Sequence, residues 1–336
     1  MKKAVAVVLI LAMLVGIAVA GCGSNNASSG DLIPVRAAFH PNLGPLTVPG
    51  IDAAMGFFAE EGLDVEWLRF TAGPPAIAAM HSGDLHFSYI GHGALALCAQ
   101  GEAEVISLSH YTNSEAILVR ASSGIQTMHD LVGRTIATEI GTSADVLLDL
   151  AATRYDIDPD DINVINMPIP NAISAFIGGS VDAVLVWGAD IVSVKNIIGD
   201  DIHTVIQTAD FMDVVPFIGS WITVNAFIEE NRDVVLAFIR ALNRVNEFRY
   251  NNLDESIQMA ADFAEAMDLA VGFDELYSEK EYLIFFSHAD WIRMLEDGTA
   301  ERDYQLQLDY KINSGRIEEG NIFDYVRFDL MREALE

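Results

Sequence analysis

Residues 64–90 read DVEWLRFTAGPPAIAAMHSGDLHFSYI, and this stretch decides the fold class. Its first seven residues predict a strand, and the turn at residues 72–75 begins a helix that ends at Gly83. Apolar and polar side chains then alternate over residues 85–90, which predicts a second strand. Because crossover helices join parallel strands, the stretch predicts a largely parallel sheet with helices on its faces.

The same alternation of strands and helices continues on both sides of this stretch. A first set of elements is predicted with strands at 34–39, 64–70, 85–90 and 104–109, and with a helix at 51–61 that Gly62 ends. A second set has strands at 115–120, 135–138, 163–167, 181–187 and 203–208. Beyond residue 221 the spacing of apolar residues is helical.

The alternation breaks twice, near residues 111–115 and near 212–221. We therefore predict an α/β protein of two lobes joined by two crossings, an arrangement that suits a hinge with a ligand cleft between the lobes. The first lobe is placed at residues 32–114, the second lobe at 115–211, and a return to the first lobe with C-terminal helices at 212–336.

The composition excludes several classes of protein. The chain has 336 residues, enough for two domains, and 51% of them are hydrophobic, so a large core can form. Asp and Glu number 49 against 19 Lys and Arg, which gives a net charge of −30. Such a negative surface repels phosphate groups, so we expect no nucleic-acid partner. Of the two cysteines one lies in the N-terminal segment, so no internal disulfide framework is predicted.

The N-terminus is typical of an exported lipoprotein. Lys2 and Lys3 precede an apolar run that ends at Cys22, and a segment rich in Gly, Ser and Asn follows. We predict a signal peptide at residues 1–21, lipidation of Cys22 and a flexible tether at residues 22–31. The alternative interpretation is an uncleaved anchor helix that contains a cysteine, and with either the remaining chain faces the outside.

Several short stretches resemble one family when they are taken in their order along the chain. They are residues 56–66, 70–75, 80–85, 115–119, 141–143 and 179–183. The resemblance is to the solute-binding lipoproteins of ABC importers, in the nitrate/sulfonate/taurine family that also contains pyrimidine-precursor binders. It implies a periplasmic-binding-protein-like fold of type II and a receptor without catalytic activity or cofactor. The chain departs from the family after Trp187, where Gly188-Ala189 replaces the frequent Asp-Pro.

The resemblance also implies partners and a location. Such a receptor closes on a small polar organic solute, which is sulfonate-, taurine-, nitrate- or pyrimidine-precursor-like, and delivers it to a membrane permease driven by a cytoplasmic ATPase. We expect a monomer that Cys22 anchors to the outer face of the bacterial cytoplasmic membrane. No arginine is assigned to a strand-end loop, so we expect a neutral or zwitterionic solute at least as readily as nitrate or an alkanesulfonate.

Candidate ligand contacts lie where the predicted strands end, because α/β sheets bind ligands outside the carboxyl ends of their strands. Helices begin at Gly73 and just after Gly141, and their free N–H groups favour a polar or anionic group. Histidine and asparagine side chains in these loops can hydrogen-bond a solute, and a tryptophan can stack on it. The predicted ligand-binding residues are Phe39, His40, Asn42, Gly73, Pro74, Gly91, His92, His110, Asn113, Glu115, Gly141, Thr142, Ser143, Trp187 and Trp221.

Two alternative functions remain open. The first is a transition-metal receptor that would use the imidazole and carboxylate groups of His40, His92, His110 and Glu115. We favour separate hydrogen-bonding roles for these residues and predict no metal site. The second is a secreted enzyme with the same fold, although no common catalytic motif occurs in the chain. Residues 91–96 match G-x-G-x-x-A, but no acid follows about 20 residues later, so a dinucleotide site is not predicted.

Overall fold

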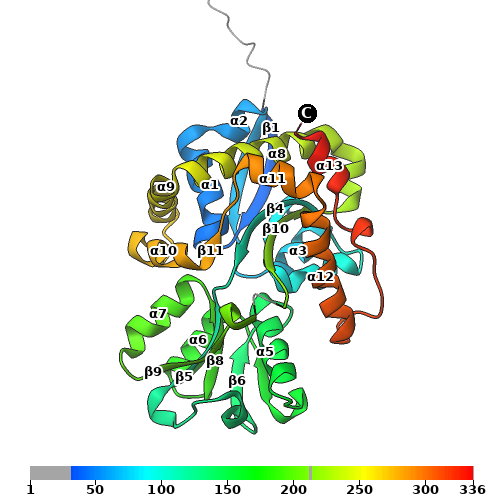
Figure 1. The fold of residues 1–336 in the computed structure, drawn as a ribbon. Coiled ribbons are helices and arrows are strands. Elements are labelled where there is room, and N and C mark those ends of the chain that lie inside the picture. Colours follow the sequence, from blue (N-terminus) through cyan, green and yellow to red (C-terminus); the bar gives the residue numbers. More distant parts are fainter. Residues whose placement is uncertain (1–31, 212–213, 336) are drawn as a thin grey trace, which may run out of the picture. The chain divides into compact units, whose positions relative to one another are not determined.

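The computed structural model describes residues 32–211 and 214–335 (Figure 1). The predicted signal peptide, the lipidation of Cys22 and the tether at residues 22–31 lie outside the described residues. Among the described helices, none has both the length and the apolar character that crossing a membrane requires.

The first of two sheets has six strands in the order β11-β4-β10-β3-β1-β2. Its strands are β1 (Ile33–Phe39), β2 (Leu63–Arg69), β3 (Phe87–Ile90), β4 (Glu104–Thr112), β10 (Phe217–Thr223) and β11 (Leu283–Ile284). Strand β1 pairs in parallel with β2 and β3, whereas β10 is antiparallel to both β3 and β4. Strand β11 is antiparallel to β4.

The second sheet has five strands in the order β7-β6-β8-β5-β9. They are β5 (Glu115–Arg120), β6 (Thr135–Thr138), β7 (Asn163–Asn166), β8 (Ala183–Trp187) and β9 (Ile202–Gln207). Strand β6 is parallel to β7 and β8, and β5 is antiparallel to β8 and β9. The chain enters this sheet between β4 and β5 and leaves it between β9 and β10.

The sheets are therefore mixed, which corrects the prediction of a largely parallel sheet. The antiparallel strands β5 and β10 are the strands that directly follow the two crossings between the sheets. Such a strand arrives without a crossover helix of its own, so the rule that helical crossovers make neighbours parallel does not apply to it.

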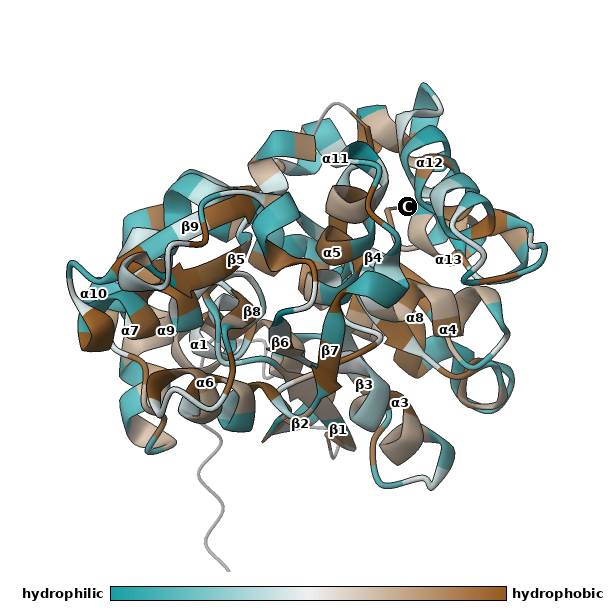
Figure 2. Cartoon of the chain, turned by 90° about the horizontal axis from the view of Figure 1, so that it is seen from below, coloured by the Kyte–Doolittle hydropathy of each residue, from teal (hydrophilic) through white to brown (hydrophobic). Residues whose placement is uncertain are grey.

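Both faces of each sheet are covered by helices, since alternate strand residues pack into different hydrophobic clusters. In the first sheet Ala37 belongs to the cluster with α1, α8 and α9, and Ala38 to the cluster with α3, α4, α11, α12 and α13. In the second sheet Ile117 packs with α5, and Leu118 with α6 and α7. Figure 2 shows the brown apolar segments concentrated in the strands and on the inner sides of these helices.

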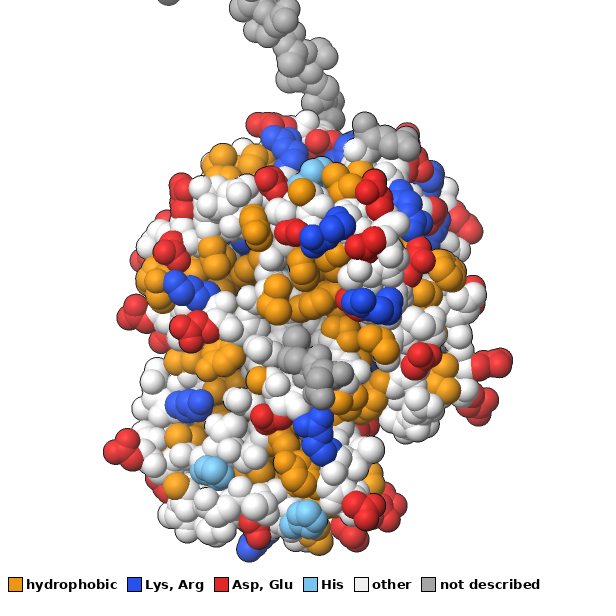
Figure 3. All heavy atoms as spheres, viewed as in Figure 1, with side chains coloured by type: hydrophobic (Ala, Val, Ile, Leu, Met, Phe, Trp, Pro, Cys, Tyr) orange, Lys and Arg blue, Asp and Glu red, His pale blue; other side chains and the backbone are white. Residues whose placement is uncertain are grey.

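The helices have the following bounds: α1 (Leu43–Met55), α2 (Phe57–Glu60), α3 (Gly73–His81), α4 (Leu95–Ala99), α5 (Ser143–Arg154), α6 (Ile169–Ile177), α7 (Ala189–Ile198), α8 (Asn225–Asn251), α9 (Leu253–Ala266), α10 (Phe273–Glu279), α11 (His288–Glu296), α12 (Thr299–Asn313) and α13 (Phe328–Glu333). Acidic side chains are spread over the face shown in Figure 3, as the net charge requires.

Helix α1 differs most from its predicted bounds of residues 51–61. It begins eight residues earlier and ends at Gly56, whose φ of +70° is the left-handed conformation of a helix C-cap. Every residue from Leu43 to Ile51 is buried. This part of α1 therefore lacks the alternation of apolar and polar positions that would predict a helix from the sequence. Pro45 lies in the first turn, where its missing N–H costs no helical hydrogen bond.

Candidate ligand pocket

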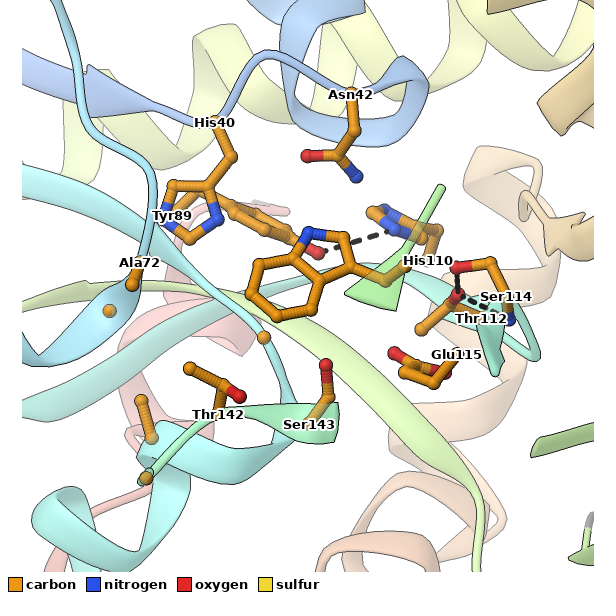
Figure 4. A pocket seen from close by; sticks show the side chains of 15 residues that line it. His40, Asn42, Ala72, Tyr89, His110, Thr112, Ser114, Glu115, Thr142 and Ser143 are labelled. Atoms are coloured by element: carbon orange, nitrogen blue, oxygen red, sulfur yellow. Dashed lines mark hydrogen bonds between the residues drawn. The ribbon is translucent and has the colours of Figure 1, made fainter. Parts of the chain in front are cut away.

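A narrow pocket with a volume of about 30 Å³ lies between residues of the two sheets (Figure 4). The lining residues from the first sheet and its loops are His40, Asn42, Ala72, Gly73, Tyr89, Gly91, Ala94, His110 and Thr112. Those from the first crossing and from the second sheet and its loops are Ser114, Glu115, Gly141, Thr142, Ser143 and Trp187.

Ten of the fifteen residues predicted from the sequence line this pocket. They are His40, Asn42, Gly73, Gly91, His110, Glu115, Gly141, Thr142, Ser143 and Trp187. Sequence reasoning missed Ala72, Tyr89, Ala94, Thr112 and Ser114. Thr112 and Ser114 flank Asn113 in the first crossing, so the break in the alternation was a usable signal for them. The two alanines carry no chemistry that a sequence could flag.

The other five predicted residues do not line the pocket. Phe39 is fully buried in the core and packs edge-to-face on Phe263. Pro74 is half-buried and adjoins Gly141. Asn113 donates its backbone N–H to Tyr282, 3.0 Å away.

Trp221 and His92 are also fully buried in the protein interior. Trp221 occupies the middle of β10 with no exposed surface, so its indole packs in the core rather than on a solute. The His92 ring stacks on Phe217 with centroids 4.4 Å apart and hydrogen-bonds Gln307 through Nδ1. Burial holds the pKa of His92 well below its ordinary value.

Of the four residues of the alternative metal site, His40, His110 and Glu115 line the pocket, whereas His92 does not. Within residues 32–211 and 214–335, no cluster of three or more His, Cys, Asp and Glu side chains could hold a metal ion. The alternative of a metal receptor built on His40, His92, His110 and Glu115 is therefore wrong.

His40 is a neutral imidazole at the wall of the pocket. Burial lowers its pKa to about 4, against which a hydrogen bond to the backbone of Ala72 acts weakly. Its Nε2 atom is buried and has no hydrogen-bond partner within the described chain. The Oδ1 atom of Asn42, at the start of α1, is in the same condition. Such orphaned polar atoms cost stability unless a ligand or water meets them.

Glu115, the first residue of β5, places a fully buried carboxyl group at the opposite side. Its Oε2 atom accepts a hydrogen bond of 2.6 Å from the Thr208 hydroxyl, and the Ser143 hydroxyl is a further donor. Burial raises the pKa of Glu115 above its ordinary value, while the two hydroxyl donors oppose that rise.

Tyr89 and His110 form a stacked pair at the floor of the pocket. Their ring centroids are 5.6 Å apart, and a hydrogen bond of 3.3 Å joins the Tyr89 hydroxyl to His110 Nε2. The other ring nitrogen of His110 hydrogen-bonds the Ser109 hydroxyl at 3.0 Å. Burial keeps the pKa of His110 well below its usual value, so this ring is neutral as well.

The C-terminal segment after α12 supports the pocket from behind. Arg316 donates hydrogen bonds to Asp145 at 2.8 Å and to Asp149 at 2.7 Å, and both carboxylates lie on α5. The same Asp145 carboxylate accepts the backbone N–H of Gly141 at 3.0 Å, and Gly141 lines the pocket. Arg316 therefore helps to fix the turn that precedes α5.

The model of the NMT1/THI5-like family matches residues 51–256. A "putative binding protein" of Brucella abortus is 31% identical over 69% of this chain and 72% of its own length. The "putative aliphatic sulfonates-binding protein" of Bacillus subtilis is 30% identical over 79% of each chain.

Solved structures share the fold at low identity. The alkanesulfonate-binding protein SsuA from Xanthomonas axonopodis pv. citri, bound to MOPS, superimposes with a TM-score of 0.62 at 18% identity, over 83% of this chain and 95% of that one. The desulfurization enzyme DSZB superimposes with a TM-score of 0.63 at 12% identity, over 90% and 99%. The fold is thus periplasmic-binding-protein-like, as the sequence predicted. Because the family model covers more than half of the chain, the protein belongs to the NMT1/THI5-like family.

Proposed function

We propose that the protein is the solute-binding component of an ABC importer and that it holds one small polar organic solute between its two sheets. The observation that carries this proposal is the pocket itself. Its wall combines residues of both sheets, and two of its buried polar atoms, His40 Nε2 and Asn42 Oδ1, have no partner in the described chain. The relatives named for binding support the same function.

Binding is proposed to proceed by movement of one lobe against the other. The lobes are residues 32–114, to which the chain returns after residue 211, and residues 115–211. Among the described strands, the chain passes from the first sheet to the second between β4 and β5 and returns between β9 and β10. Paired connections of this kind are a usual basis for hinge closure.

Location and partners follow from the same proposal. A taurine-binding relative of Escherichia coli is named as periplasmic, which supports a place outside the cytoplasm. We propose that lipidated Cys22 holds the receptor on the outer face of the membrane, as a monomer, where it meets a permease and, through it, an ATPase. Anchoring the receptor in the same membrane as its permease raises the effective concentration of the loaded receptor at the permease.

The proposal also states that the solute leaves unchanged, which separates a receptor from an enzyme of the same fold. Purified protein is incubated with a small-molecule extract, washed and examined by native mass spectrometry. We expect one added mass at a ratio of 1:1 and recovery of the same mass after denaturation. Conversion of the bound compound into a second product would establish an enzyme, and the absence of any bound compound would refute solute binding.

A further inference from the structure

Three hydrogen-bond donors near the turn before α5 are engaged within the chain: the Gly141 N–H with Asp145, the Thr142 hydroxyl with the Glu139 carbonyl at 2.7 Å, and the Ser143 hydroxyl with Glu115. The side chain of Thr142 caps no N–H group of α5, so the first turn of this helix keeps its backbone donors on that side of the pocket.

On the side of the pocket formed by His40 and Asn42, hydrogen-bond acceptors remain open. The hydrogen bond of His40 to the Ala72 backbone raises the pKa of the imidazole, so the ring donates it, and it does so through Nδ1 because Nε2 has no partner in the described chain. In this neutral tautomer Nε2 is a lone-pair acceptor. Asn42 Oδ1 is a second open acceptor. The Glu115 carboxylate has about four acceptor positions and meets two hydroxyl donors and its own backbone N–H.

The charge of the wall points in the same direction. None of the described residues that line the pocket is Lys or Arg, while Glu115 places a buried carboxyl group there. A sulfonate offers only acceptors and a negative charge, so on the side of His40, Asn42 and Glu115 it would face open acceptors and an acid in a site of low dielectric. A planar cation rich in N–H groups would satisfy those acceptors and would stack on the ring of Trp187.

We propose that the natural solute presents a planar, amidinium-type nitrogen cation to Glu115 and the His40–Asn42 side of the pocket. This inference rests on the proposed function, because it names the chemical class of the solute for the same site. The carboxylate of Glu115 pairs with the positive charge, and His40 Nε2 and Asn42 Oδ1 accept hydrogen bonds from further N–H groups of the solute.

The test is isothermal titration calorimetry of the purified protein with four compounds that share one ring: benzamidine, benzamide, benzoate and benzenesulfonate. We expect benzamidine to bind at least ten times more tightly than neutral benzamide and the two anions to give no measurable heat. Tighter binding of benzenesulfonate or benzoate than of benzamidine overturns the inference. So does the absence of binding by all four, although recovery of a solute by mass spectrometry would then still support the proposed function.

Two nearly isosteric variants test the assignment of residues. Glu115→Gln is expected to weaken benzamidine binding at least tenfold and benzamide binding less than threefold, with the melting temperature of the free variant as the control for folding. Asn42→Asp adds an acceptor charge and is expected to strengthen benzamidine binding severalfold. Unchanged benzamidine affinity in a folded Glu115→Gln, or unchanged or weaker affinity in Asn42→Asp, contradicts the inference. If Glu115→Gln fails to fold, the Asn42→Asp result decides alone.

Discussion

The backbone of Gly93, beside the first sheet, packs directly on the backbone of Thr142, which precedes α5 of the second sheet. A Cβ atom at Gly93 would lie 2.6 Å from the backbone nitrogen of Ser143 and closer still to the Thr142 carbonyl. These neighbours are backbone atoms, which cannot rotate away as a side chain can. The contact between the two parts of the chain therefore requires a glycine at this position.

Gly93→Ala is accordingly expected to wedge the two parts apart and to weaken binding of the recovered solute at least tenfold. Gly272→Ala is the control, because Gly272 does not line the pocket and its added Cβ would meet only the flexible end of the Glu275 side chain, at 3.2 Å. We expect a change of less than threefold there. Titration calorimetry measures both, and equal affinities for the two variants would show that the contact does not govern binding.

Arg316→Ala is expected to destabilise the protein by about 2 kcal/mol, because the partly buried carboxylates of Asp145 and Asp149 lose their shared partner. Solute affinity is expected to fall with it, since Asp145 also holds the Gly141 N–H. Arg293→Ala is the control: its ion pair with Asp290 is solvent-exposed, so less than about 0.5 kcal/mol is expected. Urea unfolding gives the free energies. An Arg316→Ala protein with unchanged free energy of unfolding and unchanged solute affinity would show that Arg316 does not support the pocket.

The two tryptophans predicted as ligand contacts are expected to behave oppositely. Trp187 is half-buried at the pocket, so Trp187→Ala is expected to weaken solute binding more than stability. Trp221 lies among Trp67, Tyr89 and Phe238 in the core, so Trp221→Ala is expected to cost about 3–5 kcal/mol. Thermal and urea unfolding with parallel titrations separate the two effects. A Trp221→Ala protein of normal stability but impaired binding would contradict the placement of this residue.

Acid is expected to destabilise the protein through its buried histidines. The pKa of His40 in the folded chain is about 4, below the ordinary 6.5, so the unfolded chain binds more protons between these values. Stability is therefore lost as the pH falls from 6.5 to 4, by about 3 kcal/mol for His40, and His92 and His110 act in the same direction.

Urea unfolding at pH 7 and pH 4.5 checks this pH dependence, with His40→Gln as the comparison. The variant cannot titrate at this position, so its loss of stability between the two pH values is expected to be smaller than that of the parent protein. An identical loss in both proteins would mean that His40 is already protonated in the folded state.

Most strands could be predicted because they depend on local signals. Residues 64–70 and 115–120 carry apolar side chains in runs bounded by turns, and the structure places β2 and β5 there. Strand direction is not local: β10 becomes antiparallel to β3 through a partner more than a hundred residues away. The start of α1 at Leu43 was hidden because complete burial removes the amphipathic pattern.

The pocket was predictable to the extent that it depends on strand ends. Loops after strands supplied His40, Gly91 and the residues around Gly141, as the topology of α/β sheets requires. Tyr89 was missed because it lies within a strand, where alternation indicates burial but not which face opens on a cavity. Trp221 was misplaced because the segment from residue 211 to 219 gives no sign that β10 begins at Phe217.

The central claim is that a solute draws the two sheets together around the pocket. Spin labels at Ser82→Cys and Ser123→Cys, both exposed and on different lobes, report the distance between the lobes by double electron–electron resonance. Cys22 is replaced by Ser for this purpose, and buried Cys98 resists labelling. The account predicts that the recovered solute shifts the distance distribution to one narrower population, and that Gly93→Ala abolishes the shift. The same distribution with and without bound solute would contradict it.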